Sequence, residues 1–151
     1  MLPVFADYLK ELESLYNDAA KAIDGLPREA FDWVPAPGAN SISVLITHMT
    51  GSQRFLVGDM VGDIPSQRNR QAEFETTGLD QAALTAMLGR AMTVTRDTLE
   101  KLTIADLEST QPHVKDGRSF TTTFALNHAL AHTGVHTGHL QMTRQLWDMK
   151  K

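Results

Sequence analysis

Cysteine is absent from the whole chain, which excludes disulfide bonds, thiolate metal ligands and a cysteine nucleophile of the protein's own. If the protein binds a metal ion, its ligands must therefore be histidine, aspartate or glutamate. Long apolar runs are also missing, because no window approaches the roughly 20 residues that a membrane-spanning helix needs. The first residues lack the charged region and apolar core of a signal peptide. We therefore expect a cytoplasmic protein that does not enter membranes.

Basic clusters are scarce as well. The chain has 14 basic and 18 acidic residues, which gives a formal net charge of −4, and its lysines and arginines are scattered. Proteins that bind a phosphate backbone rely on clustered Lys and Arg. We therefore expect no nucleic-acid partner.

What the chain does contain is helical periodicity. With 151 residues and 42% apolar content, it suits one domain over residues 1–151 with a single core. Apolar residues recur every three or four positions in four stretches. The predicted helices cover about 2–25, from a cap at Asn40 or Ser41 to Gly62, from a cap at Asp80 to about Leu102, and from a cap at Thr121, Thr122 or Thr123 to about Met149. This pattern predicts an all-α four-helix bundle.

The stretches between these helices are irregular. Residues 26–40 are rich in Pro and Gly and are expected to lack regular structure. Residues 62–79 are polar without clear periodicity, and a connection of this length is often functional. They could form a lid, part of a pocket wall or a plain surface loop. The Asp116-Gly117 pair could close a small hairpin between Pro112 and Phe120.

Four of the six histidines fall within the last predicted helix, at His128, His132, His136 and His139. Steps of three and four residues keep them on one stripe of the helix, together with Ala125, Val135 and Leu140. We therefore expect these histidines to face the bundle interior. His48 is the other histidine on a predicted interior face, near the middle of the second helix, whereas His113 lies in a loop beside Pro112 and is expected to be exposed.

Buried imidazoles need a partner for each ring nitrogen, and a metal ion can satisfy several rings at once. Two histidines one turn apart can converge on one ion, with a third ligand supplied by His48. Spacing alone does not choose among His128/His132, His132/His136 and His136/His139. A pH-sensing cluster and a plain polar network remain the alternatives. No glutamate follows the first histidine of any pair, so the metalloprotease arrangement is missing.

Two motifs in this chain resemble the DinB/YfiT-like superfamily. The first is the Trp33-Val34-Pro35 stretch followed by Ser41-Ile42 and then by His48 in the second helix. The second is the His-x-x-x-His-x-Gly core of the last helix, at His132, His136 and Gly138. The resemblance covers nearly the whole chain and is specific at these two motifs.

The resemblance implies an up-down-down-up four-helix bundle, often a homodimer. It also implies that His48, His132 and His136 hold one divalent metal ion, commonly zinc or nickel. His128 matches a frequent non-ligating histidine of the family. His139 departs from the pattern, because relatives have glutamine there, and it is expected either to donate a hydrogen bond to a ligand or to alter the coordination.

Three protein ligands leave a position for water or substrate, which is typical of a catalytic site. Relatives in the family include transferases that use a low-molecular-weight thiol such as bacillithiol, mycothiol or glutathione. The leading hypothesis is therefore a metal-dependent thiol S-transferase that acts on a small electrophile. The alternatives are a metal-dependent hydrolase, which would need a carboxylate base that the sequence does not single out, and a non-catalytic metal-binding stress-response protein. A fourth protein ligand such as His139 would favour the non-catalytic role.

Overall fold

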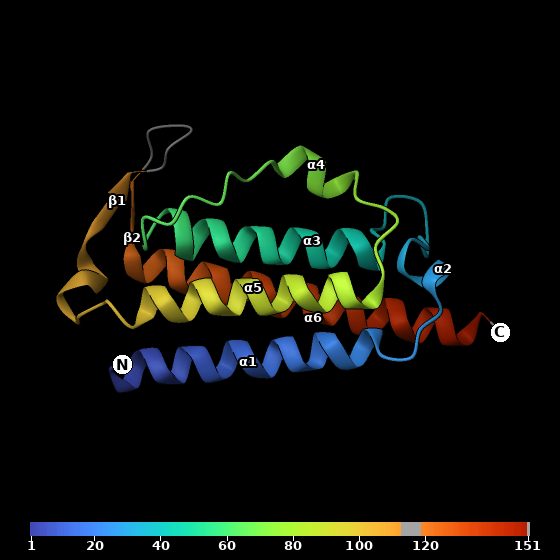
Figure 1. Cartoon of the computed structure of the whole chain (residues 1–151), viewed down its shortest axis with the longest axis horizontal. Coiled ribbons are helices and arrows are strands. Elements are labelled where there is room, and N and C mark those ends of the chain that lie inside the picture. Colours follow the sequence, from blue (N-terminus) through green and yellow to red (C-terminus); the bar gives the residue numbers. More distant parts are fainter. Residues whose placement is uncertain (113–118, 151) are drawn as a thin grey trace.

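The computed structural model describes residues 1–112 and 119–150, and four long helical segments dominate it (Figure 1). They are α1 (Pro3–Ile23), α3 (Ile42–Gln53) continued by the π-helical segment η1 (Arg54–Asp59), α5 (Gln81–Leu99) and α6 (Thr122–Met149). The all-α four-helix bundle predicted from periodicity is confirmed. Shorter elements are α2 (Arg28–Phe31), α4 (Arg70–Phe74), the 3₁₀ helix η2 (Ala105–Glu108) and the strands β1 (Thr110–Pro112) and β2 (Ser119–Thr121).

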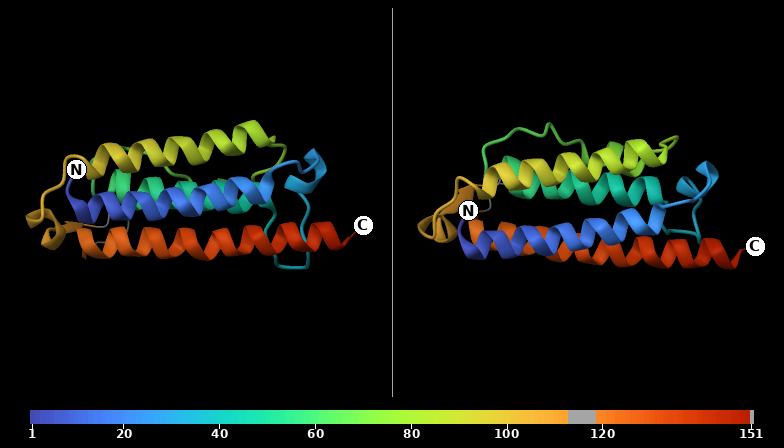
Figure 2. Two further views of the ribbon diagram at one scale, coloured as in Figure 1. Left: turned by 90° about the horizontal axis from the view of Figure 1, so that it is seen from below. Right: turned by 60° about the horizontal axis from the view of Figure 1, so that its bottom comes forward.

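The four helices run up, down, down and up, as expected. α1 and α6 start at the same end of the bundle as the N-terminus, whereas α3 and α5 start at the opposite end (Figures 1 and 2). Around the bundle the neighbours are α1 with α6, α6 with α3, α3 with α5, and α5 with α1. α3 therefore packs antiparallel to α6 and parallel to α5.

Consecutive parallel helices need a long connection. After η1 the chain must travel back along the bundle before α5 can begin, and a segment of about 18 helical residues is roughly 27 Å long. We call residues 62–79 the return connection; it passes over the outer side of α3 and carries α4 (Figure 1). The sequence did not predict this short helix, which begins where the Asn69 side chain accepts a hydrogen bond from Ala72 N at 3.2 Å.

The predicted helix starts are confirmed at their caps. Ser41, Asp80 and Thr121 each accept a hydrogen bond from the backbone N–H three residues later, at 3.3, 2.8 and 3.1 Å. The ends differ by a few residues, because α1 stops before Gly25, whose φ of +66° is left-handed, and α5 stops at Leu99. Residues 26–40 are not wholly irregular, since α2 forms a single turn there.

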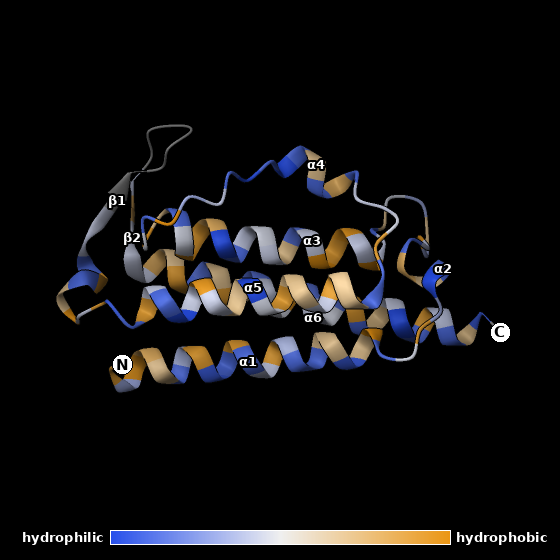
Figure 3. Cartoon of the chain, viewed as in Figure 1, coloured by the Kyte–Doolittle hydropathy of each residue, from blue (hydrophilic) through white to orange (hydrophobic). Residues whose placement is uncertain are grey.

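Hydrophobic and hydrophilic residues alternate along each long helix (Figure 3), and the apolar faces meet inside the bundle. One polar layer crosses this core. Gln53 of α3 is fully buried, and its side-chain amide donates to the Tyr8 hydroxyl of α1 and to Thr95 of α5, both at 3.1 Å. Thr133 of α6 donates to the side-chain oxygen of Gln53 at 3.4 Å. One side chain from each long helix thus takes part, which satisfies the buried amide.

A two-stranded ribbon precedes α6. β1 and β2 pair antiparallel, with Thr110 opposite Thr121. The ribbon agrees with the expected hairpin, although the proposed Asp116-Gly117 turn lies outside the described residues. Within residues 1–112 and 119–150, no helix has the length and apolar character needed to cross a membrane.

Candidate metal centre

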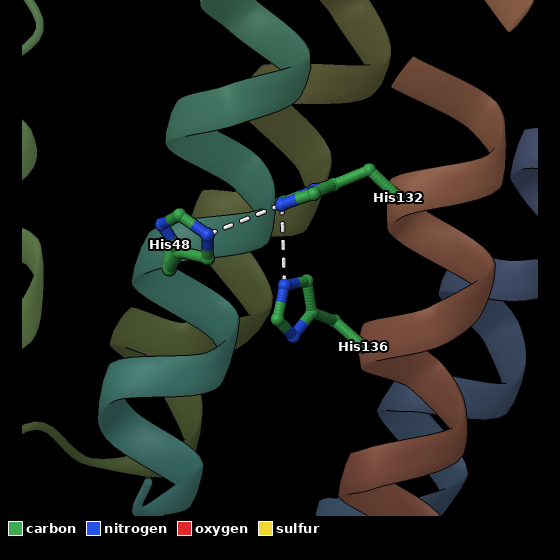
Figure 4. A group of neighbouring side chains, drawn as sticks. All are labelled: His48, His132 and His136. Atoms are coloured by element: carbon green, nitrogen blue, oxygen red, sulfur yellow. Dashed lines mark hydrogen bonds between the residues drawn. The ribbon is translucent and has the colours of Figure 1, made fainter. Parts of the chain in front are cut away.

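Three histidines meet where α3 packs against α6 (Figure 4). His48 projects from the middle of α3, and His132 and His136 project from successive turns of α6. The Nε2 atom of His132 lies 3.1 Å from Nε2 of His48 and 3.2 Å from Nε2 of His136. One ligand nitrogen from each ring falls within 4.8 Å of the other two. The structure thus brings together the three residues that the sequence analysis proposed as metal ligands.

The other histidines of α6 lie outside this group. His128 is exposed and stacks on Phe124, with ring centroids 5.5 Å apart. His139 is also exposed, and its Nδ1 lies 3.4 Å from Nδ1 of His136 rather than near the three converging nitrogens. Of the three pairs that spacing left open, only His132/His136 lies opposite His48 in the part of the chain that the structure describes. His113 falls outside that part.

The expectation that all four α6 histidines face the bundle interior is wrong. Ala125 and Leu140 are fully buried, but Val135 is 57% exposed. The buried face of α6 runs instead through small residues, including Thr133 and Thr137, and the histidines lie along its edge. Because the stripe drifts around the helix, its outer members His128 and His139 are in solvent. His132 and His136, in the middle of the stripe, are half-buried.

The return connection supplies a carboxylate to His48. Glu73 of α4 is 6% exposed, and its Oε2 lies 2.9 Å from Nδ1 of His48. A carboxylate in this position accepts the Nδ1 proton, which leaves the Nε2 lone pair directed at the other two rings. Arg68 donates from Nε to Oε1 at 2.6 Å and from a terminal nitrogen to Oε2 at 2.9 Å, so both carboxylate oxygens of Glu73 are engaged.

Gly51 of α3 makes room for this carboxylate. A Cβ atom at Gly51, three residues after His48, would collide with Oε1 of Glu73 and lie 3.0 Å from its Cδ. Because glycine weakens a helix interior by roughly 1 kcal/mol relative to alanine, its presence here has a structural reason. It lets α4 approach α3 closely enough for Glu73 to reach the histidine ring.

The electrostatics favour a charged Glu73 and neutral His132 and His136. Burial alone would raise the pKa of Glu73, but the hydrogen bonds from His48 and Arg68 and the positive charge of Arg68 outweigh burial and lower the pKa. Burial, with smaller contributions from the neighbouring histidines, lowers the pKa of His132 and His136 to about 4. Both imidazoles are therefore neutral at pH 7, the form in which histidine binds metal ions.

The donor set fits a divalent transition-metal ion. Two nitrogens bound at about 2.0–2.1 Å to a tetrahedral ion lie roughly 3.3 Å apart, and the observed separations of 3.1 and 3.2 Å are close to this value. Three neutral nitrogens that face one another also lack enough protons to hydrogen-bond in every direction. Nδ1 of His132 is buried without a hydrogen-bond partner among the described residues, so its ring lacks the support that Glu73 gives to His48.

A hollow of about 370 Å³ opens beside the cluster. His48 and His132 form one side, and Arg68 and Arg70 of the return connection form another, with Phe55 nearby. No carboxylate is among its lining residues. The pocket-wall interpretation of residues 62–79 is therefore confirmed, and a small molecule could reach the histidines from this hollow.

Sequence reasoning missed Glu73 and Arg68. Both lie in a segment without periodicity, and neither stands at a recognisable distance from a histidine in the sequence. The available signals were weak: a long polar connection and a glutamate next to Phe74, whose ring packs against His48 with centroids 4.7 Å apart. Only the path of the connection across α3 reveals their role.

Comparisons with solved structures agree on the fold. A DinB-like protein from Bacillus cereus superposes with a TM-score of 0.72 and 14% identity, covering 91% of this chain and 89% of the other. YfiT from Bacillus subtilis, described as a probable metal-dependent hydrolase with an unusual four-helix bundle topology, gives 0.73 and 14%, covering 96% and 89%. A mycothiol-dependent maleylpyruvate isomerase gives 0.64 and 13%, covering 92% of this chain but 61% of its own.

No curated protein matches the sequence. The DinB/YfiT-like resemblance inferred from the two motifs is confirmed by the shared fold. Residues 4–150 match the family described as protein of unknown function (DUF1572). With nearly its whole length matched, the chain belongs to the DUF1572 family and has the DinB-like four-helix bundle fold.

Proposed function

We propose that this protein is a metal-dependent enzyme in which His48, His132 and His136 hold one divalent transition-metal ion, with zinc and nickel as the candidates. The observation that carries the proposal is the convergence of three imidazole nitrogens from two helices beside an accessible hollow. Such an ion can lower the pKa of a bound thiol or water, or polarise a carbonyl group.

The surrounding residues position these ligands and receive the substrate. Glu73 fixes the tautomer and orientation of His48, and Arg68 holds Glu73 in place. His139 does not belong to the group formed by His48, His132 and His136, which argues against a fourth histidine ligand. The geometry therefore supports an open, catalytic site rather than a closed structural one.

For the reaction we propose thiol S-transfer to a small electrophile. The chain has no cysteine, so a sulfur nucleophile would come from a cosubstrate. One protein of the same fold is a mycothiol-dependent isomerase, which supports a low-molecular-weight thiol in this role. With a chloro-aromatic acceptor, a carbon–sulfur bond would form while the carbon–chlorine bond breaks, and chloride and the thiol proton would be released.

Metal-dependent hydrolysis is the second candidate, because YfiT is described as a probable metal-dependent hydrolase. A hydrolase benefits from a free carboxylate as general base. Glu73 is near the cluster, but both of its oxygens are hydrogen-bonded and its pKa is lowered, which makes it a weak base. This favours thiol transfer over hydrolysis in our proposal.

The first test is metal content, measured by plasma mass spectrometry on untagged protein. We expect wild type and His128→Ala to carry about one transition-metal ion per chain, and His132→Ala to lose it because a ligand is removed. A wild-type protein that binds neither zinc nor nickel after reconstitution would refute the metal centre.

The reaction is tested on the metal-loaded protein. Chloride release from a chloro-aromatic that depends on glutathione, bacillithiol or mycothiol, and that is lost in His132→Ala, would support thiol transfer. Cleavage of esters or amides with no thiol-dependent activity would contradict it and favour the hydrolase.

A further inference from the structure

A second hollow, of about 210 Å³, lies between α3, the return connection and α5. No histidine is among its lining residues, although it shares Arg68 with the hollow beside the histidine cluster. Three arginines from separate elements line it: Arg54 of η1, Arg68 of the return connection and Arg90 of α5. None of these three arginines belongs to the group of converging histidines.

The walls of this second hollow are positively charged. Glu73 is the one carboxylate among its lining residues, and that carboxylate is already held by Arg68 and His48. At neutral pH the three guanidinium groups therefore outnumber the negative charges by two. A dianion would neutralise the excess.

Two of the arginines have unused hydrogen-bonding capacity. Nε of Arg54 is buried and has no hydrogen-bond partner among the described residues. In the same part of the chain, neither Arg54 nor Arg90 forms an ion pair or side-chain hydrogen bond. Withdrawing Nε of Arg54 from water without a partner is costly. The planar donors of both arginines match the oxygens of phosphates and carboxylates.

The polar neighbours are consistent with an anion. The carbonyl oxygen of Asn69 already accepts the hydrogen bond that starts α4, which leaves its amide N–H groups as donors. Ser66 already donates its hydroxyl proton to Asp59 at 2.8 Å, so Asn69 and the arginines are the donors that remain for an anion. The volume of about 210 Å³ lies below the roughly 300 Å³ at which pockets for drug-sized ligands begin. The ligand must therefore be small.

We propose that Arg54, Arg68 and Arg90 form a binding site for a small dianionic oxyanion group, either a phosphate monoester or a dicarboxylate. The guanidinium groups of Arg54 and Arg90 contact the anion directly. Arg68 contributes charge while it remains paired with Glu73.

Calorimetric titration of the full-length protein with inorganic phosphate and, separately, with malonate tests the site at fixed ionic strength. We expect at least one of the two anions to bind at one equivalent per chain, with a dissociation constant of about 1 mM or below. If phosphate binds more tightly, the ligand class is a phosphate monoester; if malonate does, it is a dicarboxylate. Arg54→Gln and Arg90→Gln should each weaken binding about tenfold or more. Arg96→Gln is the matched control, because Arg96 is exposed on the same helix as Arg90 and does not line the hollow.

Absence of binding by both anions would overturn the proposal. Equal weakening in Arg96→Gln would also overturn it, because that result indicates attraction by general surface charge. Arg90 is exposed, so its variant is expected to fold normally. Unchanged metal content in both arginine variants would show that a loss of anion binding does not come from damage to the histidine cluster.

Discussion

Glu73 receives hydrogen bonds on both carboxylate oxygens: Arg68 donates to Oε1 and to Oε2, and His48 donates to Oε2. A histidine that binds metal through Nε2 needs its Nδ1 proton held, and a charged acceptor also makes the ring a better ligand. The Glu73 carboxylate therefore acts on the metal ion through His48. A change at Glu73 should change the metal affinity of the protein.

We predict that Glu73→Gln weakens metal affinity about 10- to 100-fold, because the amide keeps a hydrogen bond but removes the charge. Competition with a chromophoric chelator measures the change. Glu75→Gln is the control, since Glu75 is exposed and its side chain accepts a hydrogen bond only from Gln71, at 2.8 Å, among the described residues. If both variants bind metal as tightly as wild type, Glu73 has no role in supporting the ligand.

At the scale of elements, the close approach of α4 to α3 depends on Gly51. Gly51→Ala should displace Glu73, because the new methyl group would collide with its carboxylate. We expect metal binding to weaken as predicted for Glu73→Gln. The stability gain of roughly 0.5–1 kcal/mol that a glycine-to-alanine change normally gives within a helix should be absent.

Gly89→Ala provides the comparison for this prediction. A Cβ at Gly89 on α5 meets nothing within 4 Å, so this variant should be stabilised and bind metal normally. Urea unfolding and chelator competition on both variants measure the two effects. A Gly51→Ala protein that gains stability like Gly89→Ala and keeps its metal affinity would show that α4 can move without consequence.

The long helices could be predicted because their signals are local. Ser41, Asp80 and Thr121 cap helices whose apolar faces repeat over several turns. α4 could not be predicted, since five residues are too few for a periodic pattern. For the site, spacing left three possible histidine pairs open, and the family resemblance implied His132 and His136. Packing of α6 against α3 shows that this pair meets His48.

At the scale of the whole molecule, we predict that the metal-free protein becomes less stable as the pH falls into the mildly acidic range. His132 and His136 have folded-state pKa values lowered to about 4, whereas in the unfolded chain they titrate near 6.5. Between these values the unfolded chain binds more protons than the folded one, so stability falls as the pH drops from about 6.5 to about 4. Above 6.5 these two groups contribute no pH dependence.

Thermal unfolding of the chelator-treated protein at several pH values tests this prediction. We expect the midpoint temperature to fall steadily between pH 7 and pH 5. The double variant His132→Ala and His136→Ala should show a smaller decrease over the same range, because it lacks the two groups. Identical pH profiles for both proteins would contradict the assignment of the effect to these histidines.

The separation of the ligands along the chain has a kinetic consequence. His48 and His132 are 84 residues apart, and they meet only after α3 has docked against α6. Contacts between such distant residues form late, because a long loop must close first. An ion held by these histidines would therefore stabilise the native state more than the folding transition state. It would slow unfolding much more than it speeds folding. Resistance to proteolysis would then depend on whether the folded protein holds its metal ion.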